Sequence, residues 1–279
     1  VDTIGLLHEV GEINTVLIVA PKGVFHNWVR KEIPTHLPDR IEHSVCAWQP
    51  NITQKYRDEF QAFINSDKLK IFVMNVEAFS TPKGAETAAW FAKKFGEKGM
   101  MVVDESTAIK NRKANRTKAI VAAGKFFTYK RLLTGSPVTK SPMDLFSQCL
   151  FLGDNYLGYP NYYAFQGRYA VVQRRSMGHR SFQQIVGFQR LDELNLKLDD
   201  FSSRVLKKEC LDLPEKVYIR REVELTSEQK NLYRQMSKLA LAQLQDGSLV
   251  STNNVLTQIM RLQQICCGFV RDDDERTRE

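Results

Sequence analysis

One stretch of the chain constrains its fold more than any other: an apolar run that ends in two adjacent carboxylates. Residues 100–103 are all apolar, and Asp104 and Glu105 follow them directly. A strand buried on both faces of a parallel sheet is apolar along its whole length, and its C-terminal end opens into the crevice where α/β proteins bind ligands. We therefore expect a buried strand over 99–104, with both carboxylates at a ligand-binding edge.

Two neighbouring carboxylates at such an edge suit nucleotide hydrolysis. Asp104 can hold Mg²⁺ directly or through water, and Glu105 can orient or deprotonate the attacking water. A strand that simply ends in a solvated acidic turn explains the same two residues. The surrounding sequence has to decide between these interpretations.

Strand-like apolar runs alternate with amphipathic helical patterns as far as about residue 155. The predicted strands cover residues 15–20, 70–76, 99–104 and 131–134, and the predicted helices cover 24–33, 52–64, 85–95 and 115–123. Alternation of this kind predicts an α/β fold in which helices cover both faces of a parallel sheet.

The pattern changes after residue 155. Residues 154–190 are rich in Tyr, Gly and Arg and lack strand-like runs, so a helical insertion is expected. Residues 216–225 alternate as a strand does, and Thr226 and Gln229 have the spacing of a capping box that opens a helix. The predicted domains are an α/β domain at 1–155, the insertion at 156–200, a linker with a strand at 201–225, and a helical region at 226–279.

Composition and charge exclude several classes of protein. No apolar run approaches the roughly 18 residues of a membrane span, and the first ten residues lack the basic start and apolar core of a signal peptide. The five cysteines and five histidines have no metal-binding or C-x-x-C spacing, which indicates reduced thiols, a cytoplasmic location and no zinc site. A net charge of +8 favours a polyanionic partner.

Positive charge is concentrated between residues 110 and 131, where no acidic residue occurs. Such a segment suits contact with a nucleic-acid backbone, although a solvated basic face explains it too. The candidate contact residues are Lys110, Arg112, Lys113 and Arg116, together with Lys22, which follows the first strand.

Aromatic residues near the arginines of 168–190 raise the question of base stacking. Tyr162, Phe165 and Tyr169 share one helical face, which favours core packing instead. Trp28 is likewise expected to pack a helix against the sheet.

Three blocks of sequence occur in a characteristic order. They are Leu17–Pro21 with Trp28 downstream, Asp104–Asn111, and Leu133–Pro137 with Asp144–Phe146 downstream. Together they resemble motifs Ia, II and III in the first lobe of the Swi/Snf-type ATPases of helicase superfamily two, including the family-specific Ile-Lys-Asn extension of motif II. Further resemblance, to the segment between the lobes and to the start of the second lobe, lies at 204–209, 213–216, 225–229 and 262–266.

The resemblance implies a RecA-like form of the P-loop NTPase fold. It implies a DNA-dependent ATPase that moves along duplex DNA without processive strand separation, with ATP and Mg²⁺ as ligands. Asp104 is implied to hold Mg²⁺ and Glu105 to activate water, while Thr134 and Ser136 sense the Mg²⁺–phosphate geometry or bond to the acidic block. The implied DNA contacts are to the backbone and independent of base sequence.

Two features depart from the family pattern. The chain contains no G-x-x-x-x-G-K-[ST] loop, and residues 1–8 resemble the tail of the helix that follows this loop in the family. We therefore expect the chain to begin just past the loop, to stop before motifs IV–VI, and to be inactive by itself. Ser106 and Thr107 stand where many relatives have Ala and His. In those relatives the His helps to couple the nucleotide state to motif III, and here a Ser or Thr hydroxyl would have to bond across in its place.

Other functions fit the same residues. A non-catalytic nucleic-acid-binding module on a degenerate ATPase fold accounts for the charge and the fold. An unrelated P-loop kinase or GTPase accounts for the acidic strand but not for the Ile-Lys-Asn and Thr-Gly-Ser-Pro blocks. The lack of an extra domain points to a compact protein of bacterial or phage type.

Overall fold

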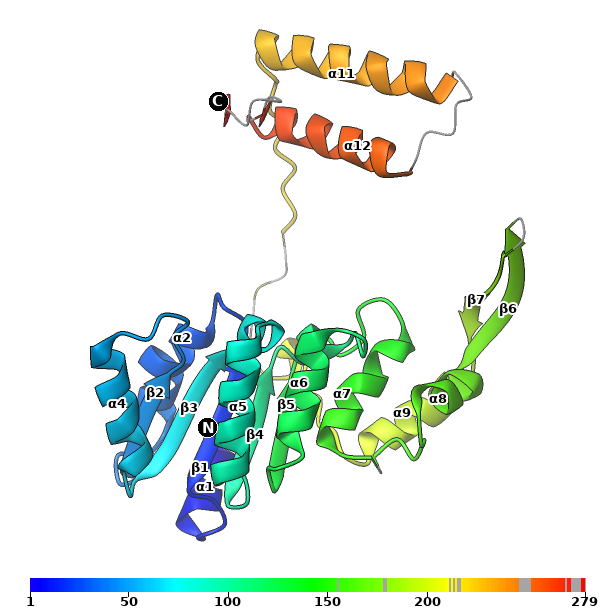
Figure 1. Cartoon of the computed structure of the whole chain (residues 1–279). Coiled ribbons are helices and arrows are strands. Elements are labelled where there is room, and N and C mark those ends of the chain that lie inside the picture. Colours follow the sequence, from blue (N-terminus) through cyan, green and yellow to red (C-terminus); the bar gives the residue numbers. More distant parts are fainter. Residues whose placement is uncertain are drawn as a thin grey trace. The chain divides into compact units, whose positions relative to one another are not determined.

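The chain folds into two compact units, Val1–Arg204 and Val205–Glu279. The computed structural model describes residues 1–154, 156–177, 180–210, 212, 214, 217–245, 252–268, 270–271 and 277–278 (Figure 1). The first unit ends inside the predicted linker, four residues beyond the predicted end of the insertion at residue 200.

The first unit is built on one parallel five-stranded sheet. Its strands are β1 (Thr15–Ala20), β2 (His43–Ala47), β3 (Leu69–Asn75), β4 (Gly99–Asp104) and β5 (Tyr129–Leu133), in the spatial order β2-β3-β1-β4-β5. The predicted parallel sheet is confirmed. Sequence analysis missed β2, because this edge strand is only partly buried and mixes polar with apolar residues.

Helices flank this sheet (Figure 1). They are α1 (Asp2–Glu9), α2 (Phe25–Asn27), the π-helix η1 (Trp28–Glu32), α3 (Ile33–His36), α4 (Gln54–Asn65), α5 (Pro82–Phe95), α6 (Asn115–Gly124) and α7 (Leu145–Leu152), with 3₁₀ turns η2 (Val76–Ser80), η3 (Ser106–Ile109) and η4 (Pro142–Asp144). The predicted helices correspond to α2–α3, α4, α5 and α6, with ends that differ by a few residues.

Two hydrophobic cores lie on opposite faces of the sheet. Val16 and Ile18 of β1 belong to a cluster that contains Ile4 of α1 and Trp28. Leu17 and Val19 belong to the other cluster, which residues of α4, α5, α6 and α7 complete. Because side chains alternate along a strand, one continuous apolar run supplies both cores, and helices on both faces are confirmed.

Residues 170–177 and 180–188 contradict the predicted absence of strands in the insertion. They form an antiparallel hairpin of β6 (Ala170–Met177) and β7 (Arg180–Phe188). Most described side chains of both strands are exposed, so the sequence carries neither the apolar run nor the alternation of a buried strand.

Helices α8 (Tyr162–Tyr169) and α9 (Leu191–Asp199) flank the hairpin and form the helical part of the insertion. Phe165 and Tyr169 are fully buried in a third core with Cys149 of α7 and Leu194 of α9. The predicted core packing of these aromatic residues is confirmed, and the insertion is therefore anchored to α7.

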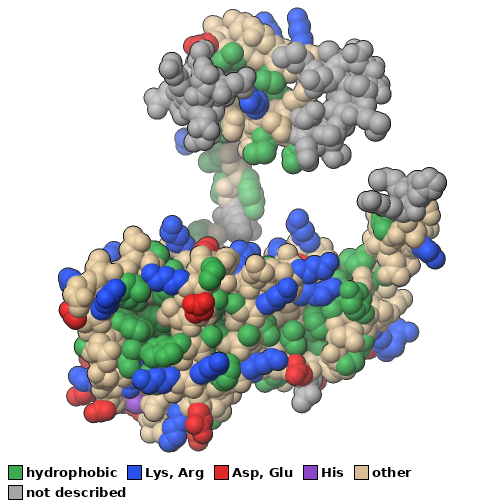
Figure 2. All heavy atoms as spheres, in the orientation of Figure 1, with side chains coloured by type: hydrophobic (Ala, Val, Ile, Leu, Met, Phe, Trp, Pro, Cys, Tyr) green, Lys and Arg blue, Asp and Glu red, His purple; other side chains and the backbone are tan. Residues whose placement is uncertain are grey.

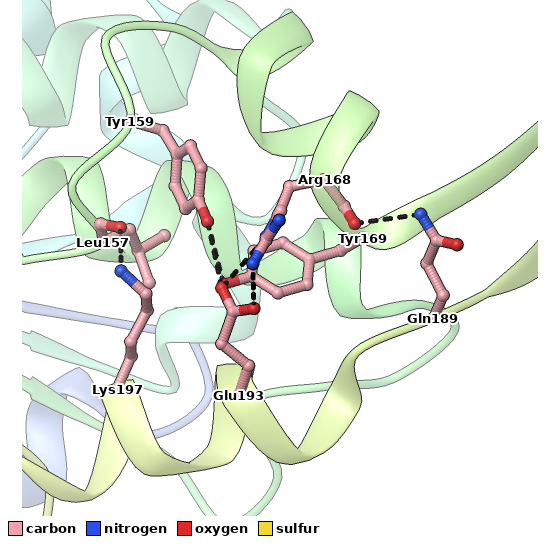
Figure 3. A network of polar contacts seen from close by, with 7 residues as sticks. All are labelled: Leu157, Tyr159, Arg168, Tyr169, Gln189, Glu193 and Lys197. Atoms are coloured by element: carbon pink, nitrogen blue, oxygen red, sulfur yellow. Dashed lines mark hydrogen bonds and ion pairs between the residues drawn. The ribbon is translucent and has the colours of Figure 1, made fainter.

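A polar network centred on Glu193 joins α8 to α9 (Figure 3). Its carboxylate pairs with Arg168 and accepts a hydrogen bond of 3.0 Å from the Tyr169 hydroxyl. The hydrogen bond from Arg168 lowers the pKa of Glu193. One of the arginines that suggested nucleic-acid contact thus has a structural partner.

The second unit differs from prediction at residues 217–225, which belong to no strand. Val217, Tyr218 and Ile219 are 75–88% exposed. Alternation alone does not make a strand, because the backbone also needs a pairing partner, and none lies beside these residues within the described part of the chain.

The predicted capping box of the second unit is confirmed. The Thr226 amide donates to Gln229 Oε1 (2.9 Å), and the Gln229 amide donates to Thr226 Oγ1 (3.2 Å). The unit comprises α10 (Lys207–Cys210), α11 (Ser227–Gln245), α12 (Thr252–Cys266), β8 (Val270–Arg271) and β9 (Thr277–Arg278). Gln229 also donates to the Ile265 carbonyl, which ties α11 to α12. None of the described helices has the length and hydropathy to cross a membrane.

Substitution of Phe91 tests the core beneath α5. Phe91 is fully buried, and its ring centroid lies 5.0 Å from that of Phe72 and 6.2 Å from that of Phe63. Phe91→Ala is expected to lower the free energy of unfolding by about 3–5 kcal/mol in urea denaturation. Trp90→Ala, next along the same helix but 43% exposed, is the matched control and should lose much less. Equal losses in the two variants would contradict this packing.

Candidate functional site

The C-terminal edge of the sheet brings the predicted site residues together. Asn75 pairs with Ala20, and Asp104 pairs with Leu133, so the segments after β3, β1, β4 and β5 begin at the same edge. The predicted site residues lie at or just after these strand ends: Lys22, Asp104, Glu105 and Thr134. This edge is where parallel α/β sheets bind ligands.

Asp104 is half-buried and each of its carboxylate oxygens accepts one hydrogen bond. The Trp28 indole Nε1 donates to Oδ2 (2.9 Å), and the Glu105 amide donates to Oδ1 (3.0 Å). A carboxylate oxygen has two lone pairs, so both oxygens keep capacity for a cation or its water. Sequence analysis assigned Trp28 to packing, which its burial confirms, but missed the hydrogen bond that orients Asp104.

Glu105 has a backbone conformation that is unusual for its residue type. Its φ and ψ angles are 49° and 60°, in the left-handed region, and its side chain is exposed. This conformation costs about 1–2 kcal/mol for a residue with a Cβ atom. It turns the chain sharply after β4 and leaves the carboxylate in solvent beside Asp104, and such strain is concentrated at functional sites.

The turn after Glu105 is bound by two adjacent side chains of α7. The Ser106 hydroxyl donates to Gln148 Oε1 (2.6 Å), and the Ser147 hydroxyl lies 2.7 Å from the Ile109 carbonyl oxygen and 2.8 Å from that of Lys110. Sequence analysis missed both α7 residues. The available signal was a polar Ser-Gln pair within the otherwise apolar stretch 145–152.

Thr134 and Ser136 lie in the loop after β5, and their side chains bond within that loop. The Ser136 amide donates to Thr134 Oγ1 (3.2 Å), and the Ser136 hydroxyl donates to the Val138 carbonyl (3.1 Å). Asp144 closes the loop by accepting from the amides of Thr139 and Lys140. Burial tends to raise the pKa of Asp144, but these hydrogen bonds outweigh it and lower the pKa.

Glu77 fixes the loop that carries Lys22. Its carboxylate accepts from the Lys22 amide (3.2 Å) and from the Asn75 amide group (3.1 Å). Burial tends to raise the pKa of Glu77, whereas these hydrogen bonds and the charge of Arg116 lower it. The Lys22 ammonium remains exposed at this edge. Sequence analysis did not identify Glu77.

The predicted basic residues differ in how far their side chains are engaged. Lys110 donates to Thr139, Arg116 donates to the Ala108 carbonyl (3.0 Å), and the Arg112 guanidinium lies 4.1 Å from the Tyr162 ring centroid. The side chains of Lys22 and Lys113 are exposed and have no partner within the described residues. Figure 2 shows Lys and Arg side chains over the visible face of the first unit, several of them together near its upper edge.

A hollow of about 690 Å³ lies at the opposite edge of the sheet. Two ion pairs lie in its lining, between Arg40 and Glu9 and between Lys68 and Glu42. The carboxylates of the candidate site are therefore not in this hollow but at the open edge formed by the strand ends.

The comparison with protein families covers nearly the whole chain. Residues 3–269 match the model of the SNF2-related domain. The chain belongs to this family. The Asp104–Glu105 pair, the Trp28 contact and the 134–140 loop are therefore features of a SNF2-related domain.

Curated relatives have similar sequences but are much longer. The DNA annealing helicase and endonuclease ZRANB3 of Bos taurus is 27% identical over 281 residues, which is 98% of this chain and 24% of that protein. The DNA repair protein RAD5 of Kluyveromyces lactis is 29% identical over 179 residues, which is 60% of this chain and 15% of that protein. The chain thus spans less than a quarter of the length of both relatives.

A solved structure supports the fold. The Sulfolobus solfataricus SWI2/SNF2 ATPase core in complex with double-stranded DNA aligns with a TM-score of 0.50 and 19% identity. The alignment covers 94% of this chain and 49% of that chain. The RecA-like fold expected from the sequence is confirmed.

The backbone strain at Glu105 predicts that glycine is more stable than alanine at this position, the reverse of their order within a helix. Glu105→Gly is expected to be about 1 kcal/mol more stable than Glu105→Ala, because only glycine adopts the left-handed conformation without a steric penalty. The measurement is the free energy of unfolding in urea. Glu86, exposed within α5, is the matched control, and there Gly should be less stable than Ala by about 1 kcal/mol. The same order at both positions would contradict the strain.

Proposed function

We propose that this chain supplies the hydrolytic half-site of a DNA-dependent ATPase that moves along duplex DNA. The observation that carries the proposal is the Asp104–Glu105 pair at the C-terminal end of the buried strand β4, with Asp104 oriented by Trp28 and Glu105 held in a left-handed turn. Membership of the SNF2-related family supports it.

The carboxylates have separate roles in this proposal. Bound Mg²⁺ supplies charge neutralisation on the nucleotide phosphates, and Asp104 would hold the ion directly or through water. Its two oxygens fit this role because each still has a free lone pair. Glu105, which is exposed and has no side-chain partner within the described residues, would orient the attacking water and accept its proton. Thr134 and Ser136 would face the phosphates from the neighbouring loop.

DNA binding in this proposal is to backbone phosphates. Lys22 and Lys113 present exposed ammonium groups, whereas Lys110, Arg112 and Arg116 also hold parts of the protein together. A cytoplasmic location, for which the scattered and unpaired cysteines argue, is part of the same proposal.

Glu105→Gln tests the hydrolytic role in the full-length gene product. The amide keeps the shape of the side chain but cannot accept a proton, so DNA-stimulated phosphate release is expected to fall by more than about 100-fold while ATP binding is kept. Glu86→Gln, an exposed change on α5, is the control and should leave the rate unchanged.

Two results would contradict the assignment. A fall of less than about tenfold in Glu105→Gln would remove Glu105 as the water-activating residue. Failure of the unaltered protein to hydrolyse ATP, together with normal DNA binding, would favour the non-catalytic nucleic-acid-binding module instead.

The salt dependence of DNA affinity tests the proposed contacts. Each lysine that meets a phosphate contributes about 0.9 to the slope of log affinity against log salt concentration. Lys22→Ala and Lys113→Ala are each expected to flatten the slope by about that amount on DNA of any sequence, measured by fluorescence anisotropy. Lys98→Ala makes the same charge change just before β4, at the opposite edge of the sheet, and should leave the slope unaltered. Equal effects of all three variants would point to net charge alone.

A further inference from the structure

Gln148 is a buried polar residue of α7 whose amide nitrogen and amide oxygen both have hydrogen-bond partners. Gln148 is 2% exposed, and Cys149 and Phe151 of the same helix are buried among apolar groups. The amide nitrogen donates to the carbonyls of Pro137 and Asp144, both at 2.8 Å, and the amide oxygen accepts from the Ser106 hydroxyl at 2.6 Å. The two carbonyl partners can only accept hydrogen bonds, so the atom that faces them is the amide nitrogen and the atom that faces the hydroxyl is the amide oxygen.

These contacts connect two segments of the candidate site. Ser106 directly follows the carboxylate pair and is itself 1% exposed. Pro137 lies in the loop that holds Thr134 and Ser136. Their side chains bond within that loop, so among the described residues Gln148 makes the side-chain bridge from Ser106 to the backbone of residues 134–138.

The adjacent Ser147 provides a useful contrast. It is equally buried and its hydroxyl contacts the carbonyls of Ile109 and Lys110, but among the described residues none of its own hydrogen bonds reaches the loop after β5, which the Lys110 side chain contacts separately at Thr139. One helix thus presents two neighbouring polar residues to the same acidic block, and only one of them continues to the loop.

We propose that Gln148 is a positioning residue that couples the acidic end of β4 to the 134–140 loop. A buried hydrogen bond is costly to leave unmade, so a shift of Ser106 either moves Gln148 or leaves both groups unsatisfied. Because the amide of Gln148 binds Ser106 and Pro137 at once, a shift at one end changes the support of the other. This inference rests on the proposed function for its nucleotide-linked role, but the coupling itself does not require ATP.

Backbone hydrogen exchange of the purified chain tests the coupling without activity. The amides of Ser136, Thr139 and Lys140 are hydrogen-bonded in the loop and serve as reporters. Ser106→Ala does not touch the loop, yet it is expected to raise exchange of these amides about tenfold, the equivalent of one net hydrogen bond. Ser147→Ala, the matched control from the same helix, should leave them unchanged.

A second pair of variants separates coupling from loss of folding. Gln148→Leu removes the bridge, and the double change Ser106→Ala with Gln148→Leu replaces both partners by apolar groups, which is the milder perturbation. Both are expected to raise loop exchange about as much as Ser106→Ala, and the double variant no more than Gln148→Leu alone. Unchanged loop exchange in Ser106→Ala, or an equal rise in Ser147→Ala, would overturn the proposal.

The nucleotide-linked role needs one further measurement on the full-length gene product. Mg²⁺-ATP is expected to slow hydrogen exchange of the loop amides in the unaltered protein. In Gln148→Leu most of this protection should be lost, although the affinity for ATP is kept. Protection that persists in Gln148→Leu would overturn the role of Gln148. Absence of ATP binding in the unaltered protein would instead overturn the proposed function, and the exchange result in the purified chain would still stand.

Discussion

Burial of β4 between β1 and β5 is the constraint on which the rest of the first unit depends. Val102 of this strand contributes to one core, and Met101 and Val103 contribute to the other, so the strand has to be apolar until it leaves the sheet. The first position at which charge is tolerated is the C-terminal edge, where Asp104 is half-buried and Glu105 exposed. The same hydrophobic effect that places the strand at the centre thus places the carboxylates at the ligand-binding edge.

The carboxylates are then held by elements from distant parts of the chain. Trp28 reaches Asp104 from the π-helix that follows β1, and α7 binds the turn that follows Glu105. A rigid support of this kind matters for phosphoryl transfer, since catalysis there is mostly positioning and charge stabilisation. It also explains why a strained backbone at Glu105 is tolerated: the burial of the flanking strand and helix outweighs a cost of about 1–2 kcal/mol.

Several basic residues of the candidate DNA-binding segment have structural roles as well. Arg112 packs on Tyr162 and so contacts helix α8 of the insertion. Arg116 of α6 donates a hydrogen bond to the Ala108 carbonyl and so ties α6 to the turn after the carboxylate pair. A guanidinium can keep such contacts and still meet a phosphate, because it carries five N–H donors. The exposed side chains of Lys22 and Lys113 have no partner within the described part of the chain, so their substitution tests DNA binding separately from stability.

The sequence by itself determined four of the five strands of the central sheet, most of its helices, the capping box at Thr226 and the position of the carboxylate pair, because these follow from local periodicity and from burial of apolar runs. The tertiary structure decided the features that depend on contacts between residues far apart in the sequence. The strands Ala170–Met177 and Arg180–Phe188 exist through cross-strand pairing, whereas residues 217–225 alternate but pair with no strand in the described part of the chain. The bonds from Trp28 to Asp104 and from Gln148 to Ser106 join residues separated by 76 and 42 positions, so only the packed fold brings them together.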